Sequence, residues 1–520
     1  MLESASSAVP HGICRKLDRL FFVLQYEDDT LLFSTAKSAA AQTLKEVLLA
    51  FSEISGIHLN FNKCSLVPFN LSAPSLNSIT STLQVNTAEL PLHYLGLPLT
   101  LNKPDRLAYQ DIIDKVQRKL AGWRSSLLSR AGRVLLASSV LSSIPVYFMS
   151  VFKLPIWVIK AIDRIRRNFI WSSSTNQGRG MHLLSWDRVC LPKSFGGFGL
   201  LDLKLQNIAL LLRWWWRLSN NPNSLWSASA RRLYAKRDPS VPPILWNTAG
   251  SFFWRDLFSI RLFFQLCTFS QVGSGLATSF WYENWGGSCL YYCTPNSKPS
   301  ARRFISLRSA FSSVQELLPS PMTFQQSSLC EVLANLSFTD QPDKLLSKYT
   351  SNGIYTASSA YRFLVSAGKI RFPLKCIWKF KVPPSIKFFL LLLAHTRILT
   401  QDQLLKRHIY FTPGCVLCLQ QNCETASHLF FLCPFSKQLW HSFGFSNTLA
   451  SLSSQDSVLL SLQLLFQSAA RDRLKLTLIA TSLWAIWLER NNRTFRQQSR
   501  RLDAVHHWII SESTLFMKCC

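Results

Sequence analysis

The sequence has few acidic residues and no long apolar run. Its 520 residues include 28 Asp and Glu against 57 Lys and Arg, which leaves a formal net charge of +29. The longest apolar run, Phe388–Ala394, is far shorter than the roughly 20 residues that a membrane-spanning helix needs. The first residues lack the basic and apolar regions of a secretory signal peptide. We therefore expect neither a transmembrane helix nor a signal peptide.

Apolar residues are abundant enough to form several cores. Hydrophobic residues make up 48% of the chain and aromatic residues 12%, which excludes wholesale disorder. A chain of this length usually forms roughly two to four domains. The positive charge indicates a polyanionic partner, with nucleic acid favoured over the alternative, an acidic membrane surface.

The positive charge is concentrated in one part of the chain. Residues 101–240 contain 23 basic and 7 acidic residues and no Glu, whereas residues 1–100 contain 6 basic and 8 acidic residues. Binding to a phosphate backbone needs many donors on one surface, so this concentration favours a nucleic-acid partner. The alternative is a solvated surface rich in Arg.

Three consecutive carboxylates lie near the start of the chain. The residues predict a hairpin in which Leu20–Tyr26 is a buried strand, Thr30–Ser34 is its return, and Glu27, Asp28 and Asp29 lie between them. Neighbouring carboxylates at the tip of an apolar hairpin repel one another unless a cation or solvent compensates them. The hairpin therefore indicates either a metal site or an exposed turn, in which Asp is common.

This hairpin is the first of five segments that resemble one family in their order. Gln25–Phe33 contains an aromatic residue, one variable residue and two Asp, which is the pattern of the catalytic hairpin of reverse transcriptases. The chain thus resembles the plant non-LTR (LINE-type) retrotransposon reverse transcriptases. The four segments that follow are Ser55–Cys64, His93–Pro98, Trp123–Gly132 and Ile144–Ser150.

The resemblance implies RNA-directed DNA synthesis on an RNA template and a DNA primer. Nucleotidyl transfer uses two Mg²⁺ ions bound by carboxylates, and the resemblance makes Asp28 and Asp29 the catalytic, metal-binding pair. Asp28 is the direct ligand in this interpretation and Asp29 its companion. Glu27 replaces a residue that is usually small in the family, and it adds a third charge.

The family's site also needs an Asp on an earlier strand, followed by a template-gripping segment rich in Gly, Gln and Pro, and we expect both of these, and the fingers, to be missing from this sequence. We therefore expect a truncated reverse transcriptase that is inactive alone, with Mg²⁺ bound only if the complete site exists. The alternative is a non-catalytic nucleic-acid-binding protein or a retroelement remnant. The family implies a nuclear location, although the sequence contains no clear import signal.

Apolar residues recur at helical spacing from Arg106 to Trp171 and predict helices. Their position after the hairpin resembles the thumb, which packs on the primer–template duplex. The basic residues beside the apolar stripes are the candidates for nucleic-acid contacts, and the alternative is a solvated face. These candidates are Lys115, Arg118, Lys119, Arg164 and Arg167.

Two further features follow the basic segment. Gly196–Leu203 resembles a turn of the family that leads into a helix, predicted over Lys204–Leu218. That helix contains Trp214, Trp215 and Trp216, which cover too much of its circumference for one base-stacking face. We expect the three tryptophans to pack in the core and at subdomain contacts; base stacking is the alternative, because Arg213 and Arg217 lie beside them.

Four potential metal ligands lie close together near the end of the chain. Cys415 and Cys418 are separated by two residues, and His428 and Cys433 follow within a short segment. Three Cys and one His close a tetrahedral shell, so the pattern predicts a structural zinc site. Cys423 could replace one ligand, and reduced core residues without a metal are the alternative.

The surrounding residues resemble the reverse-transcriptase zinc-binding domain of the same family, and Ser482–Asn491 resembles its tail. We expect no C-terminal nuclease, because no ribonuclease H carboxylate set follows.

The predicted fold class is α+β and mostly helical, with a small helix-rich zinc-binding domain. The predicted domains are 1–100, part of the palm; 101–172, a thumb-like helical segment; 173–350, a connection region; 351–441, the zinc-binding domain; and 442–520, a helical tail.

Overall fold

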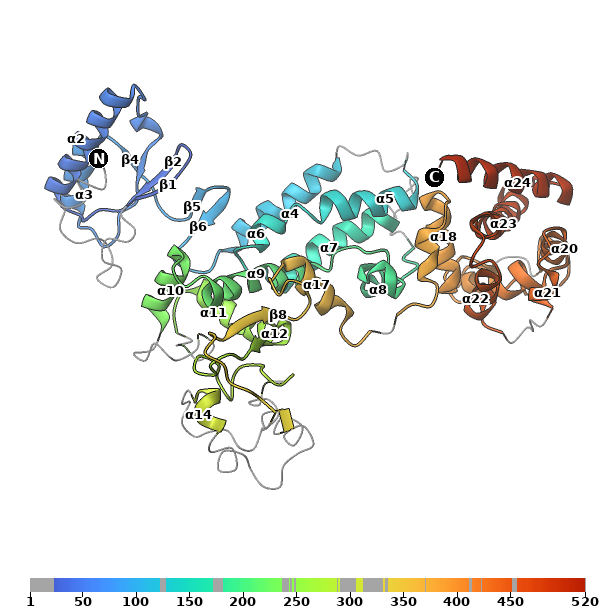
Figure 1. The fold of residues 1–520 in the computed structure, drawn as a ribbon. Helices are drawn as coiled ribbons and strands as arrows, with labels where there is room; N and C mark the ends of the chain where they lie inside the picture. The colour runs from blue at the N-terminus through green and yellow to red at the C-terminus, as the bar shows by residue number, and fades with distance from the viewer. Residues whose placement is uncertain are drawn as a thin grey trace. The chain divides into compact units, whose positions relative to one another are not determined.

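The computed structural model is mostly helical, as the sequence predicts (Figure 1). It describes residues 23–121, 128–171, 181–235, 249–287, 305–311, 335–369, 371–410, 414–421, 423–450 and 456–519, with a few isolated positions between 243 and 332. The chain forms two compact units. Unit 1 comprises residues 1–111, 148–154 and 207–361, and unit 2 comprises residues 112–147, 155–206 and 362–520. The division into palm, thumb and connection stays a prediction.

The strands of unit 1 form small sheets. Among the residues that the structure describes, each sheet has two strands, and only the second pair is parallel. The pairs are β1 (Val23–Tyr26) with β2 (Asp29–Leu32), β3 (Ser65–Leu66) with β4 (Asn86–Thr87), β5 (Leu92–Tyr94) with β6 (Leu97–Leu99), and β7 (Thr268–Gln271) with β8 (Lys344–Ser347).

The predicted acidic hairpin is present, but its strands are not buried. β1 and β2 pair antiparallel, and Asp29 is the first residue of β2, opposite Tyr26. Glu27 has a left-handed backbone with φ of 52°, which is uncommon for a residue with a side chain. Residues 23–26 are half-buried or exposed, so the prediction of a buried strand is wrong for them. The described sheet has no further strand to cover it, and Leu20–Phe22 lie outside the described residues.

The three tryptophans of α9 (Leu203–Asn220) pack within unit 1, and the helix itself continues from unit 2. Trp215 donates a hydrogen bond to the carbonyl oxygen of Leu257, and Trp214 donates one to the carbonyl oxygen of Ser150. The ring of Trp216 stacks on Tyr355. Trp215 is buried, whereas Trp214 and Trp216 are half-buried, so the prediction of core packing is confirmed for Trp215. The other α-helices described in unit 1 are α2 (Ser38–Ser55), α3 (Ala73–Leu83), α10 (Leu225–Tyr234), α11 (Phe252–Ser259), α12 (Arg261–Cys267) and α14 (Leu307–Phe311), and the short helix α6 (Val146–Met149) has residues in both units.

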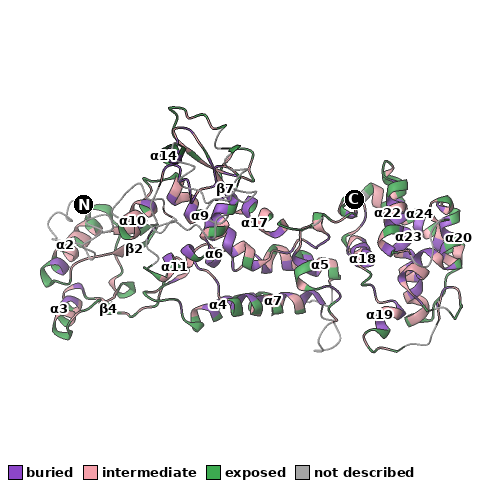
Figure 2. Cartoon of the chain, turned by 90° about the horizontal axis from the view of Figure 1, so that it is seen from below, coloured by how far each residue is buried: buried purple, intermediate pink, exposed green. Residues whose placement is uncertain are grey.

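The basic segment forms the predicted amphipathic helices. α4 (Arg106–Ala121) buries Ile112 and Val116, and α7 (Ile156–Trp171) buries Ile162 and Phe169. Figure 2 shows exposed and buried residues on opposite sides of both helices. α5 (Arg130–Leu136) and the π-turn η3 (Ala137–Leu141) lie between them in the chain. The first part of the motif Trp123–Gly132 lies outside the described residues.

Unit 2 is built around α18 (Pro384–Ala394). This helix contains the longest apolar run of the sequence, and every residue from Phe388 to Ala394 is buried. A helix that is apolar on all sides is typical of a core, and α18 packs against α5, α22 and α23. None of the described helices has the length and apolar character needed to cross a membrane. The other elements of unit 2 are α8 (Trp186–Cys190), α19 (Gln401–Leu405), η7 (His428–Leu432), α20 (Pro434–Ser442), α21 (Ser446–Leu449), α22 (Val458–Ser468), α23 (Arg473–Asn491), η8 (Asn492–Arg496) and α24 (Leu502–Cys519); α17 (Ala357–Ser366) joins the two units.

The glycine turn near residue 196 packs on the end of α18. Phe198 stacks on Phe388 with ring centroids 4.7 Å apart. Gly196 has φ of +79°, and a Cβ there would lie 2.7 Å from the ring of Phe372. His395 lies 2.9 Å from the carbonyl oxygen of Gly196 through Nε2 and stacks on Phe372. The turn therefore needs glycine and links residues 181–206 to the core of unit 2.

We expect the stability of unit 2 to decrease as pH falls below the ordinary pKa of histidine. Burial lowers the pKa of His395, the bond to Gly196 opposes this shift, and the charges of Arg188 and Arg397 add to it. The unfolded chain therefore takes up the proton at a higher pH than the folded chain. The resulting stabilisation is fully present above about pH 6.5 and is lost as pH falls through the lowered pKa.

The measurement is the thermal unfolding midpoint between about pH 7.5 and 5.5, compared for the unchanged chain and His395→Gln. The glutamine variant should show the smaller change with pH, because its side chain does not titrate. His507→Gln replaces an exposed histidine and serves as the control. Equal pH dependence in the unchanged chain and His395→Gln would contradict this role for His395.

Candidate metal centre

Two of the predicted zinc ligands lie on a tight turn after α19. The backbone N–H of Cys415 donates to the carbonyl oxygen of Gln420, and the N–H of Leu419 donates to the carbonyl oxygen of Cys415. Leu419 has a left-handed backbone with φ of 60°. This closed turn places the thiols of Cys415 and Cys418 on the same side.

The other two ligands lie at the two ends of η7. His428 is its first residue, and Cys433 follows its last residue and is the N-cap of α20. The N–H of Cys433 donates to the carbonyl oxygen of His428 at 2.7 Å, which fixes the spacing between the two ligands. Pro434 occupies the first turn of α20, where a missing N–H costs no hydrogen bond.

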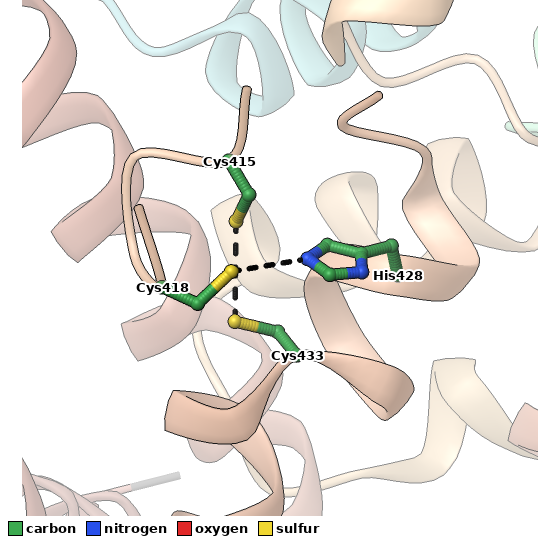
Figure 3. A group of neighbouring side chains, drawn as sticks. All are labelled: Cys415, Cys418, His428 and Cys433. Atoms are coloured by element: carbon green, nitrogen blue, oxygen red, sulfur yellow. Dashed lines mark hydrogen bonds between the residues drawn. The ribbon is translucent and has the colours of Figure 1, made fainter. Parts of the chain in front are cut away.

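The four ligand atoms converge on one point (Figure 3). Cys415, Cys418, His428 and Cys433 place their ligand atoms within 4.8 Å of one another. The two sulfur atoms of Cys415 and Cys433 are 3.9 Å apart, and Cys418 Sγ lies 3.5 Å from His428 Nε2. In a tetrahedron with Zn–S of about 2.3 Å and Zn–N of about 2.0 Å, these separations are about 3.8 Å and 3.5 Å. The residues therefore fit a zinc ion with three thiolates and one imidazole.

Hydrogen bonds favour the thiolate of Cys415. The bond from the Cys433 thiol lowers the pKa of Cys415 most; burial opposes it, while His428 and the N–H groups of Leu417 and Cys418 lower the pKa further. The bond to Cys415 and burial raise the pKa of Cys433. Because zinc binds the thiolate form, backbone N–H groups near these sulfur atoms stabilise the ligand that the metal requires.

A buried ion pair braces the segment between the two pairs of ligands. Glu424 and Arg490 are 0% and 2% exposed. Arg490 Nη2 lies 2.8 Å from Glu424 Oε1, and Arg490 Nε lies 3.0 Å and 3.1 Å from the two carboxylate oxygens. Burial raises the pKa of Glu424, and the bonds from Arg490 oppose that shift. The pair fixes α23 against the segment that leads to His428.

Two further side chains hold the turn of Cys415 and Cys418. Arg493 donates from Nη1 to the carbonyl oxygen of Leu417 at 3.2 Å and from Nε to Glu489 at 2.8 Å. Gln401, on α19, donates from Nε2 to the carbonyl oxygen of Gly414 at 2.8 Å. Side chains that orient a metal-binding loop in this way influence metal affinity, although they touch no metal.

The sequence predicted the four ligands but not this support. Glu424 lies in the segment that resembles the zinc-binding domain, and Arg490 lies in the tail Ser482–Asn491. The resemblance predicts no structural role for either residue. The sequence does contain one signal for this support: Glu489 and Arg490 stand next to each other at the end of an apolar stretch. Charged residues in such a position are buried only when they have partners of opposite charge. Cys423 is exposed and lies outside the group of four.

The predicted catalytic carboxylates lie at the tip of the β1–β2 hairpin. Asp28 is in the turn, Asp29 begins β2, and both are exposed, as is Glu27. Within the described part of the chain, the group around Cys415 is the one set of three or more side chains placed to hold a metal. Asp28 and Asp29 by themselves therefore do not fit a complete Mg²⁺ site.

The predicted nucleic-acid contacts differ in their exposure. Lys115, Arg118 and Lys119 are exposed on α4, and Arg164 is exposed on α7. Arg167 is half-buried, with its guanidinium 5.3 Å from the ring centroid of Trp186. The four exposed side chains can therefore reach a partner from solvent, whereas the guanidinium of Arg167 packs on an aromatic ring.

Comparisons with known proteins agree with this geometry. Residues 355–440 match a family model described as zinc-binding in reverse transcriptase. The chain is 27% identical over 360 residues to "Putative ribonuclease H protein At1g65750" of Arabidopsis thaliana, a match that covers 66% of this chain and 57% of the relative. It is 30% identical over 144 residues to "Uncharacterized mitochondrial protein AtMg00310" of Arabidopsis thaliana, covering 28% of this chain and 92% of the relative. The chain thus spans little more than half the length of the first relative.

Proposed function

The chain belongs to the plant retrotransposon proteins of the reverse-transcriptase type, and on that premise we propose that it binds nucleic acid during RNA-directed DNA synthesis. Its partners in this proposal are the RNA template and the DNA primer. The zinc ion is structural, since three cysteines and one histidine fill a tetrahedral shell and leave no position for a substrate. The observation that carries the proposal is the convergence of four metal ligands within the segment 355–440, which matches the zinc-binding model of reverse transcriptases.

The charge of the chain supports nucleic acid as the partner. The net charge is +29, and α4 presents Lys115, Arg118 and Lys119 to solvent beside the buried stripe that contains Ile112 and Val116. Exposed cations on one helix face can replace the counterions of a phosphate backbone, and their release makes binding depend on salt. A zinc-stabilised fold keeps such surfaces in a fixed arrangement.

We expect the full chain to bind a labelled RNA–DNA hybrid with an affinity that falls linearly with salt on logarithmic axes. Fluorescence anisotropy at several salt concentrations measures the slope. Replacement of Lys115, Arg118 and Lys119 by alanine should reduce the slope by about 0.9 per lost phosphate contact. The α23 control, in which the exposed Arg471, Arg473 and Lys475 become alanine, removes the same charge. Absence of salt-dependent binding by the unchanged chain would overturn the proposal.

The acidic hairpin has a narrower role in the proposal. Asp28 and Asp29 supply part of a Mg²⁺ site, and polymerisation needs a third carboxylate to complete it. Primer extension on an RNA template with Mg²⁺, compared with the Asp28→Ala Asp29→Ala variant, tests this role. A DNA product that the unchanged chain and the variant make in equal amounts would contradict this part of the proposal.

A further inference from the structure

Three arginines and one histidine lie near one another in unit 2, beside the turn of Gly196. This arginine cluster consists of Arg188 on α8, Arg397 after α18 and Arg407 after α19, with His395 next to Arg188. Residues from separate parts of the chain form it, and none of its members belongs to the zinc group or to the exposed face of α4.

Contacts hold the members of the cluster in place. Arg188 Nη1 lies 3.4 Å from His395 Nδ1, and both Nη atoms of Arg407 lie 3.4 Å from the carbonyl oxygen of His182. His395 is fixed in turn by Gly196 and by stacking on Phe372. Through His395, Arg188 thus contacts the packing that requires glycine at position 196.

The cluster concentrates positive charge without carboxylate partners. In the part of the chain that the structure describes, none of Arg188, Arg397 and Arg407 forms a salt bridge. The nearby carboxylate Asp402 pairs with Lys406 instead, and Asp187 precedes Arg188 without a salt bridge to it. Burial lowers the pKa of Arg407, and the charge of Arg397 lowers it further. Like charges in such a position raise the free energy of the chain unless an anion approaches.

We propose that the arginine cluster binds the sugar–phosphate backbone of nucleic acid, as a second contact surface in addition to α4. This inference rests on the proposed function, because it assumes that the chain binds nucleic acid. Guanidinium groups match phosphate oxygens with paired N–H donors, and they are less strongly hydrated than ammonium groups. The contacts of Arg188 and Arg407 reduce the side-chain entropy that these two residues lose on binding.

The test replaces Arg188, Arg397 and Arg407 by alanine together and measures binding to the labelled RNA–DNA hybrid. The α23 control removes three exposed charges from the same unit. We expect the cluster variant to bind roughly tenfold or more weakly, with a salt slope reduced by about 0.9 per lost contact, while the control stays close to the unchanged chain. Equal binding by the two variants would overturn the inference.

A second variant distinguishes the loss of a binding contact from misfolding of the triple variant. Arg397 is exposed, and its positive charge repels the charged forms of His395 and Arg407. Arg397→Ala should therefore leave the fold intact. We expect this single change to weaken binding severalfold and to leave zinc content and the circular dichroism spectrum unchanged. Unaltered affinity would contradict the cluster's role. If the unchanged chain binds no hybrid, the proposed function itself fails; if it binds and only the cluster variants have no effect, the inference alone fails.

Discussion

Replacement of Cys415 by serine is expected to remove zinc from the chain and to unfold the segment around it. Cys415 is 1% exposed, and its sulfur lies 3.9 Å from that of Cys433. A serine hydroxyl is a poor zinc ligand, and a shell of three ligands loses most of its affinity. Structural zinc sites contribute roughly 10–16 kcal/mol of apparent binding free energy in small zinc-finger peptides, so the effect on folding is large.

Elemental analysis should give close to one zinc per unchanged chain and almost none in Cys415→Ser, with a lower thermal unfolding midpoint in the variant. Cys423→Ser is the matched control, because Cys423 is exposed and lies outside the ligand group although it is only eight positions further along the chain. It should retain zinc. An unchanged chain without zinc, or equal loss of zinc from both variants, would contradict the assignment of the ligands.

Replacement of Glu424 by glutamine is expected to destabilise unit 2 by about 3–5 kcal/mol. The change leaves Arg490 buried with its charge uncompensated, since Arg490 is 2% exposed and directs three bonds at the carboxylate. Denaturant unfolding measures the free energy. Replacement of both partners by apolar residues, Glu424→Leu with Arg490→Met, should restore part of the loss, because no unpaired charge remains.

The surface pair of Lys406 and Asp402 provides the control for this ion pair. The two groups are 3.7 Å apart, and the Lys406 side chain is 70% exposed. Exposed pairs of this kind contribute about 0–1 kcal/mol, so Lys406→Met should change stability little. If Glu424→Gln were no more destabilising than Lys406→Met, the ion pair would not brace the metal-binding segment.

The zinc ligands and the helices were predictable because their signals are local. Two residues separate Cys415 from Cys418, a spacing that lets one turn present both thiols. The recurrence of Ile112 and Val116, or of Ile162 and Phe169, defines one face of a helix without reference to the rest of the chain. The apolar run Phe388–Ala394 likewise became the central buried helix of unit 2.

The support of the metal centre and the arginine cluster depend on contacts between distant residues. Glu424 and Arg490 are 66 positions apart, and Arg188 and His395 are 207 positions apart. No periodicity or spacing in the sequence connects such residues, because tertiary packing alone brings them together. The buried β1 strand was a wrong prediction for the same reason. Its residues are apolar enough for a core, but burial needs a neighbour that the described sheet does not supply.

The zinc site and the arginine cluster are structurally connected. Gln401 on α19 holds the carbonyl oxygen of Gly414, next to Cys415, and Arg407 follows the same helix. Loss of zinc should therefore displace α19 and with it part of the cluster. Zinc in this account maintains the surface that nucleic acid contacts, without itself contacting the substrate.

The most direct measurement is the affinity of the full chain for a labelled RNA–DNA hybrid before zinc removal, after chelation, and after zinc is returned, with zinc content determined each time. If zinc stabilises the protein surface that binds nucleic acid, binding should be strong and salt-dependent, lost on chelation, and recovered when zinc is returned. Two results would contradict this role of zinc. One is an unchanged affinity when elemental analysis shows that the metal is gone, and the other is no binding in any of the three states.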